Sequence, residues 1–169
     1  MTTPNQPLDS ATLSTPVGPW GIVVLDGVVV ASGFAPAEEM AHRLAPDLRE
    51  RGLRERRDLG SVTVAARAYL DGDLSALDAV AVSQPGGPFL QEVWRVMRQI
   101  PAGQTWTYAE LATKAGRPTA VRAAGSGCAR NLVAPFVPCH RVVRSDGTLG
   151  GYYYGLPAKE WLLAHEHIA

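Results

Sequence analysis

The residues with the greatest chemical potential stand together at Cys139, His140 and Arg141. A cysteine thiolate is the most nucleophilic side chain available at neutral pH, and cationic neighbours favour it by lowering the pKa of the thiol. We expect these residues on an extended segment, where adjacent side chains point to opposite sides, so that His140 would act on Cys139 through a water. Cys139 is therefore the candidate nucleophile and His140 its candidate base.

A histidine base needs a carboxylate that orients its ring, and the last predicted helix offers Glu160 and Glu166. The residues alone do not choose between them. The second cysteine, Cys128, lies among small residues and is predicted to be a packing residue, because free cysteines are commonly buried. Two cysteines without CxxC spacing predict neither a disulfide framework nor a zinc site.

Helices are predicted around these residues. Apolar residues at helical spacing predict an amphipathic helix from Phe89 to Ile100, followed by helices over 108–114, 119–130 and 157–165. Between the second and third lies the tight turn Gly116-Arg117-Pro118. A helix, a tight turn and a second helix are typical of DNA-binding proteins, but also of helical hairpins that bind nothing.

The amino-terminal half has a different pattern. Two β-branched runs joined by Asp26-Gly27 predict a β-hairpin, since this pair accepts positive φ at little cost. Residues 1–11 are polar and are expected to form a loose leader. The run Gln84-Pro85-Gly86-Gly87-Pro88 is a strong breaker, which predicts domains over 1–87 and 88–169. The other predicted elements are helices over 37–49 and 61–70, joined by a charged connection, and a strand over 77–82.

Composition and charge narrow the function further. The 169 residues are 46% hydrophobic and 19% charged, as in ordinary globular proteins. The formal net charge is zero, but residues 1–88 carry 7 basic and 11 acidic groups, and residues 89–169 carry 9 and 5. The basic half predicts either a polyanion partner or a solvated basic face. The sequence has neither a span of membrane length nor a secretory signal, so we expect a cytoplasmic protein.

At Pro138-Cys139-His140-Arg141-Val142 the sequence resembles the O6-alkylguanine-DNA alkyltransferase family, the direct-reversal DNA repair proteins that move an alkyl group from guanine to their own cysteine. Upstream of Phe89 the likeness is only architectural. From about Phe89 to Glu166 it extends, in the same order, through Ile100-Pro101-Ala102-Gly103, Thr107-Tyr108, Arg122-Ala123-Ala124-Gly125, Gly155-Leu156 with Lys159, and Trp161-Leu162-Leu163.

The resemblance implies a catalytic set. Cys139 would accept the alkyl group and be consumed, with His140 activating it through a water and Glu166 orienting the imidazole. Tyr108 would assist protonation of the departing guanine, and developing charge would be neutralised near Lys159. Asn131 would connect the helix predicted over 119–130, which would contact DNA, to the loop that contains Cys139. No cofactor or metal is implied.

The resemblance also implies a partner, duplex DNA containing O6-alkylguanine and also O4-alkylthymine, bound by a monomer or by protein assembled along the DNA. Arg122 would enter the duplex and fill the gap left by a flipped nucleotide. Small residues would allow the helix to approach the minor groove. The implied DNA contacts are Tyr108, Arg122, Ala123, Ala124, Gly127 and Arg130, and the implied pocket residues are Val142, Tyr152, Tyr153 and Tyr154.

The sequence departs from the family pattern at two points. Leu132 follows Asn131 where proline is common, and the loop Gly151-Tyr152-Tyr153-Tyr154-Gly155 is unusually rich in tyrosine. Because Tyr153 and Tyr154 would narrow the pocket mouth, we expect methyl adducts to be preferred over benzyl adducts.

The implied fold is a small mixed α/β domain followed by a mostly helical domain with a winged helix-turn-helix core. Three other functions fit the residues less well. A damage sensor without chemistry would lack the acceptor, yet Cys139 is present. A transcriptional regulator would need base-reading side chains, whereas small residues surround Arg122. A thiol peptidase would need a cysteine–histidine dyad, which adjacent residues do not readily form.

Overall fold

The protein was analysed as a computed structural model that describes residues 6–167. Two compact units make up the chain. The first contains the chain up to Gln84 together with Leu132–Phe136, and the second contains Pro85–Asn131 and the chain from Val137 onward. No helix among the described residues is long and apolar enough to cross a membrane.

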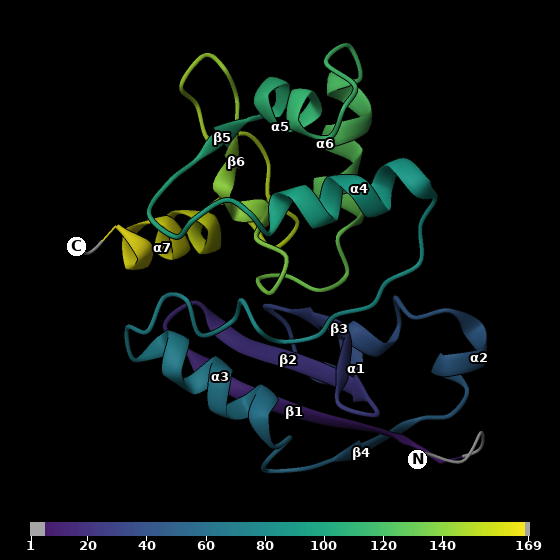
Figure 1. The fold of residues 1–169 in the computed structure, drawn as a ribbon. Coiled ribbons are helices and arrows are strands. Elements are labelled where there is room, and N and C mark those ends of the chain that lie inside the picture. Colours follow the sequence, from purple (N-terminus) through teal and green to yellow (C-terminus); the bar gives the residue numbers. More distant parts are fainter. Residues whose placement is uncertain (1–5, 168–169) are drawn as a thin grey trace. The chain divides into compact units, whose positions relative to one another are not determined.

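A four-stranded sheet forms the centre of the first unit (Figure 1). Its strands are β1 (Leu8–Thr15), β2 (Gly18–Leu25), β3 (Val28–Gly33) and β4 (Leu53–Glu55), in the order β3-β2-β1-β4. Strand β2 is antiparallel to both of its neighbours, and β4 is parallel to β1. The predicted hairpin is confirmed, and both turn residues have positive φ, 50° at Asp26 and 79° at Gly27.

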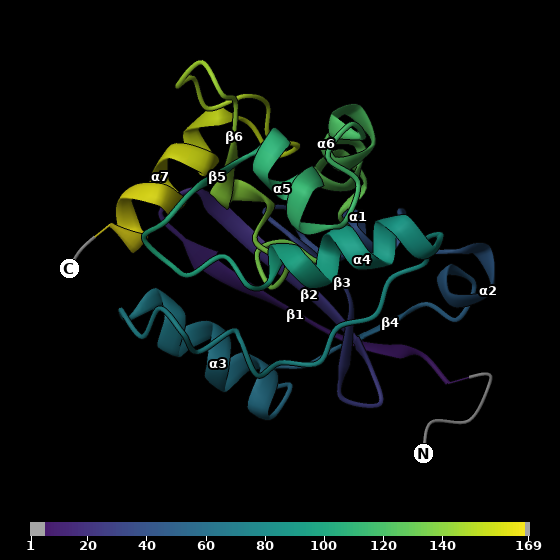
Figure 2. The ribbon, with the colours of Figure 1, turned by 45° about the horizontal axis from the view of Figure 1, so that its top comes forward.

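Helix α3 (Ser61–Leu70) runs along the sheet, as Figures 1 and 2 both show. Its Tyr69 packs edge-on against Trp20 of β2, with the ring centroids 6.4 Å apart. Both side chains are almost completely buried. Aromatic and β-branched side chains therefore form the core of the first unit.

Four expectations for the first unit are corrected by the structure. Residues 8–11 of the expected leader belong to β1, where small polar residues hide the alternation of a half-buried strand; residues 1–5 lie outside the described part. The expected helix over 37–49 is two helices, α1 (Ala37–Ala41) and α2 (Pro46–Arg49), because the residue before a proline disfavours helical backbone. The charged connection contains β4. The expected strand over 77–82 is a series of turns with one bridge, between Val29 and Val82.

The segment Leu132–Phe136 completes the first unit, although it follows the helices of the second unit in the sequence. The amide of Ser32 donates to the carbonyl of Leu132 at 2.8 Å, and the Ser32 hydroxyl donates to the carbonyl of Ala134 at 2.7 Å. The ring of Phe136 lies 5.7 Å from that of Trp20. Five residues adjacent to the cysteine loop thus belong to the core of the other unit.

The second unit is mostly helical, as expected. Its helices are α4 (Pro88–Met97), α5 (Tyr108–Lys114), α6 (Val121–Arg130) and α7 (Leu156–Glu166). Strands β5 (Trp106–Thr107) and β6 (Val142–Val143) pair in parallel. Thr107 and Glu110 form a reciprocal capping box that fixes the start of α5. The mixed α/β fold class is confirmed, and the winged form of the helix-turn-helix stays a prediction.

Helices α4 and α6 pack closely because Gly127 has no side chain. A Cβ atom at Gly127 would come within 2.8 Å of Cγ1 of Val93. At the same point, the Trp94 indole nitrogen donates to the Gly127 carbonyl at 2.9 Å. This contact fixes α6 against α4 and so positions the residues of α6 that line the site.

Candidate functional site

Cys139 is the first residue of a 3₁₀ turn, η1 (Cys139–Arg141), and not part of an extended segment as expected. The tight turn follows Pro138, whose ring restricts the backbone. Cys139 is 6% exposed and lines a cavity of about 290 Å³. The cavity is lined by residues of α5, α6, η1 and the loop before α7: Tyr108, Gly125, Cys128, Ala129, Cys139, Gly151, Tyr152 and Tyr153.

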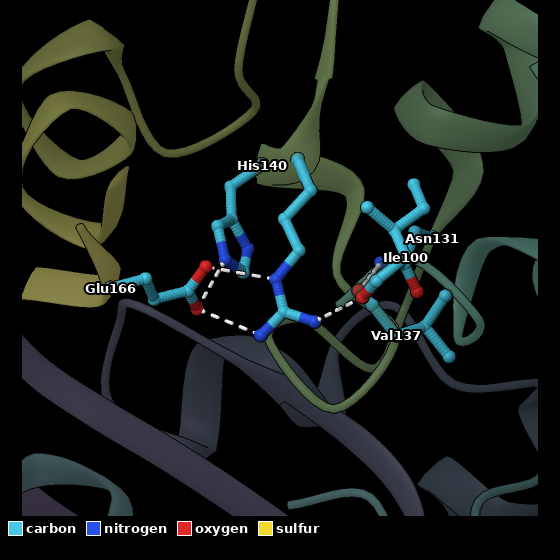
Figure 3. A network of polar contacts seen from close by, with 6 residues as sticks. Ile100, Asn131, Val137, His140 and Glu166 are labelled. Atoms are coloured by element: carbon cyan, nitrogen blue, oxygen red, sulfur yellow. Dashed lines mark hydrogen bonds and ion pairs between the residues drawn. The ribbon is translucent and has the colours of Figure 1, made fainter. Parts of the chain in front are cut away.

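His140 and Arg141 converge on one buried carboxylate, that of Glu166 in α7 (Figure 3). Nε2 of His140 lies 2.8 Å from Oε2 of Glu166. The Arg141 guanidinium donates to both carboxylate oxygens, at 2.8 and 2.9 Å, and to the carbonyl of Ile100 at 2.7 Å. Glu166, and not Glu160, is therefore the partner of His140. Glu160 is exposed and lines another cavity.

The environment holds His140 neutral and Glu166 ionised. Complete burial lowers the pKa of His140, although Glu166 opposes this by hydrogen bonding and charge. Burial would raise the pKa of Glu166, but hydrogen bonds from His140 and Arg141, with the Arg141 charge, hold it well below its usual range. Because a carboxylate only accepts, Nε2 of the neutral ring carries the hydrogen and Nδ1 has the lone pair. Among the residues that the structure describes, Nδ1 has no hydrogen-bond partner, so it is available as a base.

Asn131 and Lys159 both hold backbone near Cys139. The Asn131 amide donates to the carbonyl of Val137 at 2.8 Å, which joins the end of α6 to the cysteine loop (Figure 3). The ammonium of Lys159 donates to the carbonyls of Val142, Leu149 and Gly151, at 2.8, 2.5 and 3.2 Å. An ammonium has three hydrogens, so these carbonyls use its full donor capacity. In this geometry, Lys159 fixes the loop and does not point a free donor into the cavity.

Tyr108, the first residue of α5, lines the cavity. Burial raises the pKa of Tyr108 to about 12, with smaller contributions from Cys128 and Cys139. The phenol is therefore protonated at neutral pH and can donate a hydrogen bond. A Cβ atom at Gly125 would lie 3.7 Å from Cδ1 of Tyr108, so the ring packs directly on α6.

The structure divides the predicted DNA-contacting residues of α6 into two groups. Arg122, Ala123 and Arg130 are exposed. Ala124 is completely buried, and Gly127 is buried against α4. Small size at these two positions therefore serves packing within the unit, and we no longer assign Ala124 and Gly127 to a DNA contact.

The predicted pocket residues are also divided. Tyr152 and Tyr153 line the cavity, and Tyr153 is 62% exposed at its edge. Tyr154 packs edge-on against both, with ring centroids 5.7 and 4.9 Å apart, and supports them from behind. The side chain of Val142 is completely buried, and its carbonyl accepts from Lys159, so neither group faces the cavity.

Two site residues were not recognised from the sequence. Arg141 was noted only as a cationic neighbour of Cys139, yet it shares Glu166 with His140. Cys128 was predicted to be a packing residue, yet it lines the same cavity as Cys139. Helical spacing could have found Cys128, since it lies three residues after Gly125 on the same face of α6.

Known proteins resemble this chain in sequence. Residues 88–168 match the family model described as 6-O-methylguanine DNA methyltransferase, DNA binding domain. A curated relative from Shigella flexneri, named methylated-DNA--protein-cysteine methyltransferase, is 44% identical over 107 residues, which cover 63% of each chain. A Salmonella typhimurium relative of the same name is 46% identical over 98 residues, or 58% of this chain and 57% of that one. The matched part thus spans less than two thirds of these relatives' length.

Solved structures resemble the chain over nearly its whole length. Mycobacterium tuberculosis O6-methylguanine methyltransferase has a TM-score of 0.76 and 28% identity, covering 95% of this chain and 93% of that one. The structure of Mycobacterium tuberculosis OGT in complex with DNA has a TM-score of 0.77 and 28% identity, covering 94% of this chain and 92% of that one.

The fold and the site together define a class of protein: an α/β unit and a helical unit, the second carrying a cysteine pocket beside a buried histidine–carboxylate pair. In the sequence of residues 88–168 and in its fold, the chain resembles the 6-O-methylguanine DNA methyltransferase family.

Proposed function

We propose that the protein repairs DNA by transferring the alkyl group of O6-alkylguanine to Cys139. The observation that carries this proposal is the cavity that Cys139 lines, together with the buried His140–Glu166 pair that begins at the next residue. The proposed partner is duplex DNA, bound by a monomer or by protein assembled along the DNA. The reaction needs no cofactor.

In the proposed mechanism, Nδ1 of His140 removes the thiol proton of Cys139 through a bridging water. The thiolate attacks the alkyl carbon in line, a carbon–sulfur bond forms, and the bond from that carbon to guanine O6 breaks. Glu166 stabilises the imidazolium that forms, since an ionised carboxylate lies 2.8 Å from Nε2. The thioether product has no leaving route, so each molecule reacts once.

Tyr108 is the proposed donor to the departing guanine. It lines the same cavity as Cys139, and its raised pKa keeps the phenol protonated. A hydrogen bond from this phenol would stabilise the negative charge that develops on the base. In this proposal, Lys159 and Asn131 are positioning residues, because both hold backbone carbonyls near the reacting thiol.

The guanine must leave the duplex to reach the cavity, so the proposal includes base flipping. Arg122 is exposed near the start of α6 and would fill the gap, with Ala123 and Arg130 on the exposed part of the same helix. Residues 88–169 would thus form the DNA-binding and alkyl-transfer domain. O4-alkylthymine is a second proposed substrate, as its adduct is also an alkyl group on an exocyclic oxygen of a base.

The intact mass of the protein tests this function after incubation with duplex DNA that contains one O6-methylguanine. We expect wild type to gain one methyl group, located by peptide mapping to Cys139, and Cys139→Ala to gain none. If wild type binds the lesion tightly without a mass change, the protein is a damage sensor and the proposal is wrong.

A further inference from the structure

The cavity contains a second thiol that the proposed alkyl transfer does not use. Cys128 reaches the cavity from α6, and Cys139 reaches it from η1. Neither is in a disulfide, and the chain has no other cysteine.

The two thiols lie within electrostatic range of each other and of the Tyr108 phenol. After burial, the charge of Cys139 is the largest effect that raises the pKa of Cys128, and both cysteines raise the pKa of Tyr108. The opposite effect comes from the Lys159 ammonium, which favours the Cys128 thiolate. Cys128 is thus a neutral thiol beside the reactive one, not a second thiolate competing for the alkyl group.

A thiol that is activated for attack on carbon also reacts with peroxides. Oxidation to sulfenic acid is reversible, but further oxidation to sulfinic acid is irreversible unless a nearby thiol intervenes. A protein whose single acceptor thiol reacts only once loses all activity when that thiol is oxidised irreversibly. A second thiol in the same cavity would therefore have a direct protective effect.

We propose that Cys128 is a resolving cysteine, which captures oxidised Cys139 as an intramolecular disulfide across the cavity. The inference rests on the activation of Cys139 in the proposed function. The oxidant is hydrogen peroxide: the Cys139 thiolate attacks one peroxide oxygen, the O–O bond breaks, and Cys139 becomes a sulfenic acid while hydroxide leaves and is protonated to water. The Cys128 sulfur then attacks the sulfenic sulfur, the S–S bond forms, and the hydroxyl group leaves with the Cys128 proton as water.

The disulfide would close the site reversibly, since the bond would cross the space that the flipped base must enter. Reduction by a dithiol would return both thiols and reopen the cavity. Peroxide would then convert Cys139 into an inactive disulfide that can be reduced again, instead of oxidising it irreversibly.

Peroxide treatment of the full chain tests this inference. The reduced protein is exposed to a graded series of hydrogen peroxide concentrations, then mapped by mass spectrometry without reduction. We expect wild type to lose the mass of two hydrogen atoms, with the Cys128 and Cys139 peptides joined. After treatment with dithiothreitol, methyl transfer should recover almost fully in wild type. In Cys128→Ala, Cys139 should gain two oxygen atoms and recovery should be several-fold lower.

A matched control keeps two thiols but moves the second out of the cavity. Ser126 is exposed on the other side of α6, so Cys128→Ala combined with Ser126→Cys should behave like Cys128→Ala alone. The inference is overturned if wild-type Cys139 reaches the sulfinic state as fast as in Cys128→Ala, or if the joined peptides occur only in covalent dimers. Methyl transfer by the untreated proteins, measured in parallel, separates these outcomes from a failure of the proposed function.

Discussion

Glu166 performs two tasks with one carboxylate, because it accepts from His140 and balances the buried charge of Arg141. Glu166→Gln keeps the volume but leaves Arg141 without a counter-charge. Removing one partner of a buried ion pair costs about 3–5 kcal/mol. We expect a loss of unfolding free energy of that order in urea denaturation, and slower single-turnover methyl transfer.

Glu160→Gln is the matched control, since Glu160 is exposed on the same helix. This change should alter the unfolding free energy by no more than about 0.5 kcal/mol. Equal effects of the two substitutions would show that the buried network does not stabilise the protein.

The two pKa shifts at this network predict how stability depends on pH. The pKa of His140 is below its usual 6.5 in the folded state, so the unfolded chain binds the proton more readily and stability falls as pH drops below about 6.5. The pKa of Glu166 is below its usual 4.5, so its contribution is present above that pH and is lost as pH falls toward the folded value. Both pKa shifts therefore make the free energy of unfolding decrease as the pH falls.

We therefore expect the unfolding free energy of wild type to decrease from pH 7 downward, first through His140 and then through Glu166. Urea denaturation at pH 7, 6, 5 and 4 measures it. Glu166→Gln should lack the decrease contributed by this carboxylate below about pH 4.5. Stability that rises on acidification between pH 7 and 5 would contradict this assignment.

At the scale of elements, Gly127 sets the distance between α4 and α6. Gly127→Ala gains helix propensity of about 1 kcal/mol, but its Cβ would lie 2.8 Å from Cγ1 of the buried Val93. Because overpacking of a core costs about 1–3 kcal/mol, we expect a net loss of stability in urea denaturation. Gly125→Ala is the matched control on the same helix, since its Cβ would make only ordinary contact with Tyr108, at 3.7 Å. The control should gain up to about 1 kcal/mol.

Tyr152 and Tyr153 of the loop before α7 line the cavity. Tyr153 is held at the edge by Tyr154, 4.9 Å away between ring centroids. We expect faster single-turnover transfer from O6-methylguanine than from O6-benzylguanine, and Tyr153→Ala should raise the benzyl rate more than the methyl rate. Comparable wild-type rates for the two substrates would overturn this expectation.

Elements with a strong local signal were predictable from the sequence, and those defined by distant contacts were not. The Asp26-Gly27 turn and the helix Ser61–Leu70 depend on local backbone preferences and periodicity. Strand β1 contains small polar residues that give little strand signal, and the strand is recognisable only from its pairing with β2. At the site, Cys139 and His140 were recognisable by residue type, but the position of Cys128 in the cavity and the Arg141–Glu166 pair depend on how α6, η1 and α7 pack.

At the scale of the whole molecule, the chain passes between the two units three times, after Gln84, Asn131 and Phe136. Residues 6–84 alone lack Phe136, which packs on Trp20, and lack the carbonyl of Ala134 that accepts from Ser32. Loss of a buried phenylalanine side chain costs about 3–5 kcal/mol. We expect a fragment that ends at Gln84 to show no cooperative unfolding transition by circular dichroism. The same fragment, joined by a flexible linker to residues 130–137, should regain a cooperative unfolding transition. A cooperative transition in the fragment that ends at Gln84 would contradict this expectation.

The place of Leu132–Phe136 in the first unit also fixes an order of events on the ribosome. Synthesis proceeds from the amino terminus, so the first unit waits with an incomplete core until Phe136 has emerged. Cys139 is only three codons further on. A translation product that stops before this point therefore has neither a finished first unit nor Cys139, and its incomplete core would expose it to proteolysis.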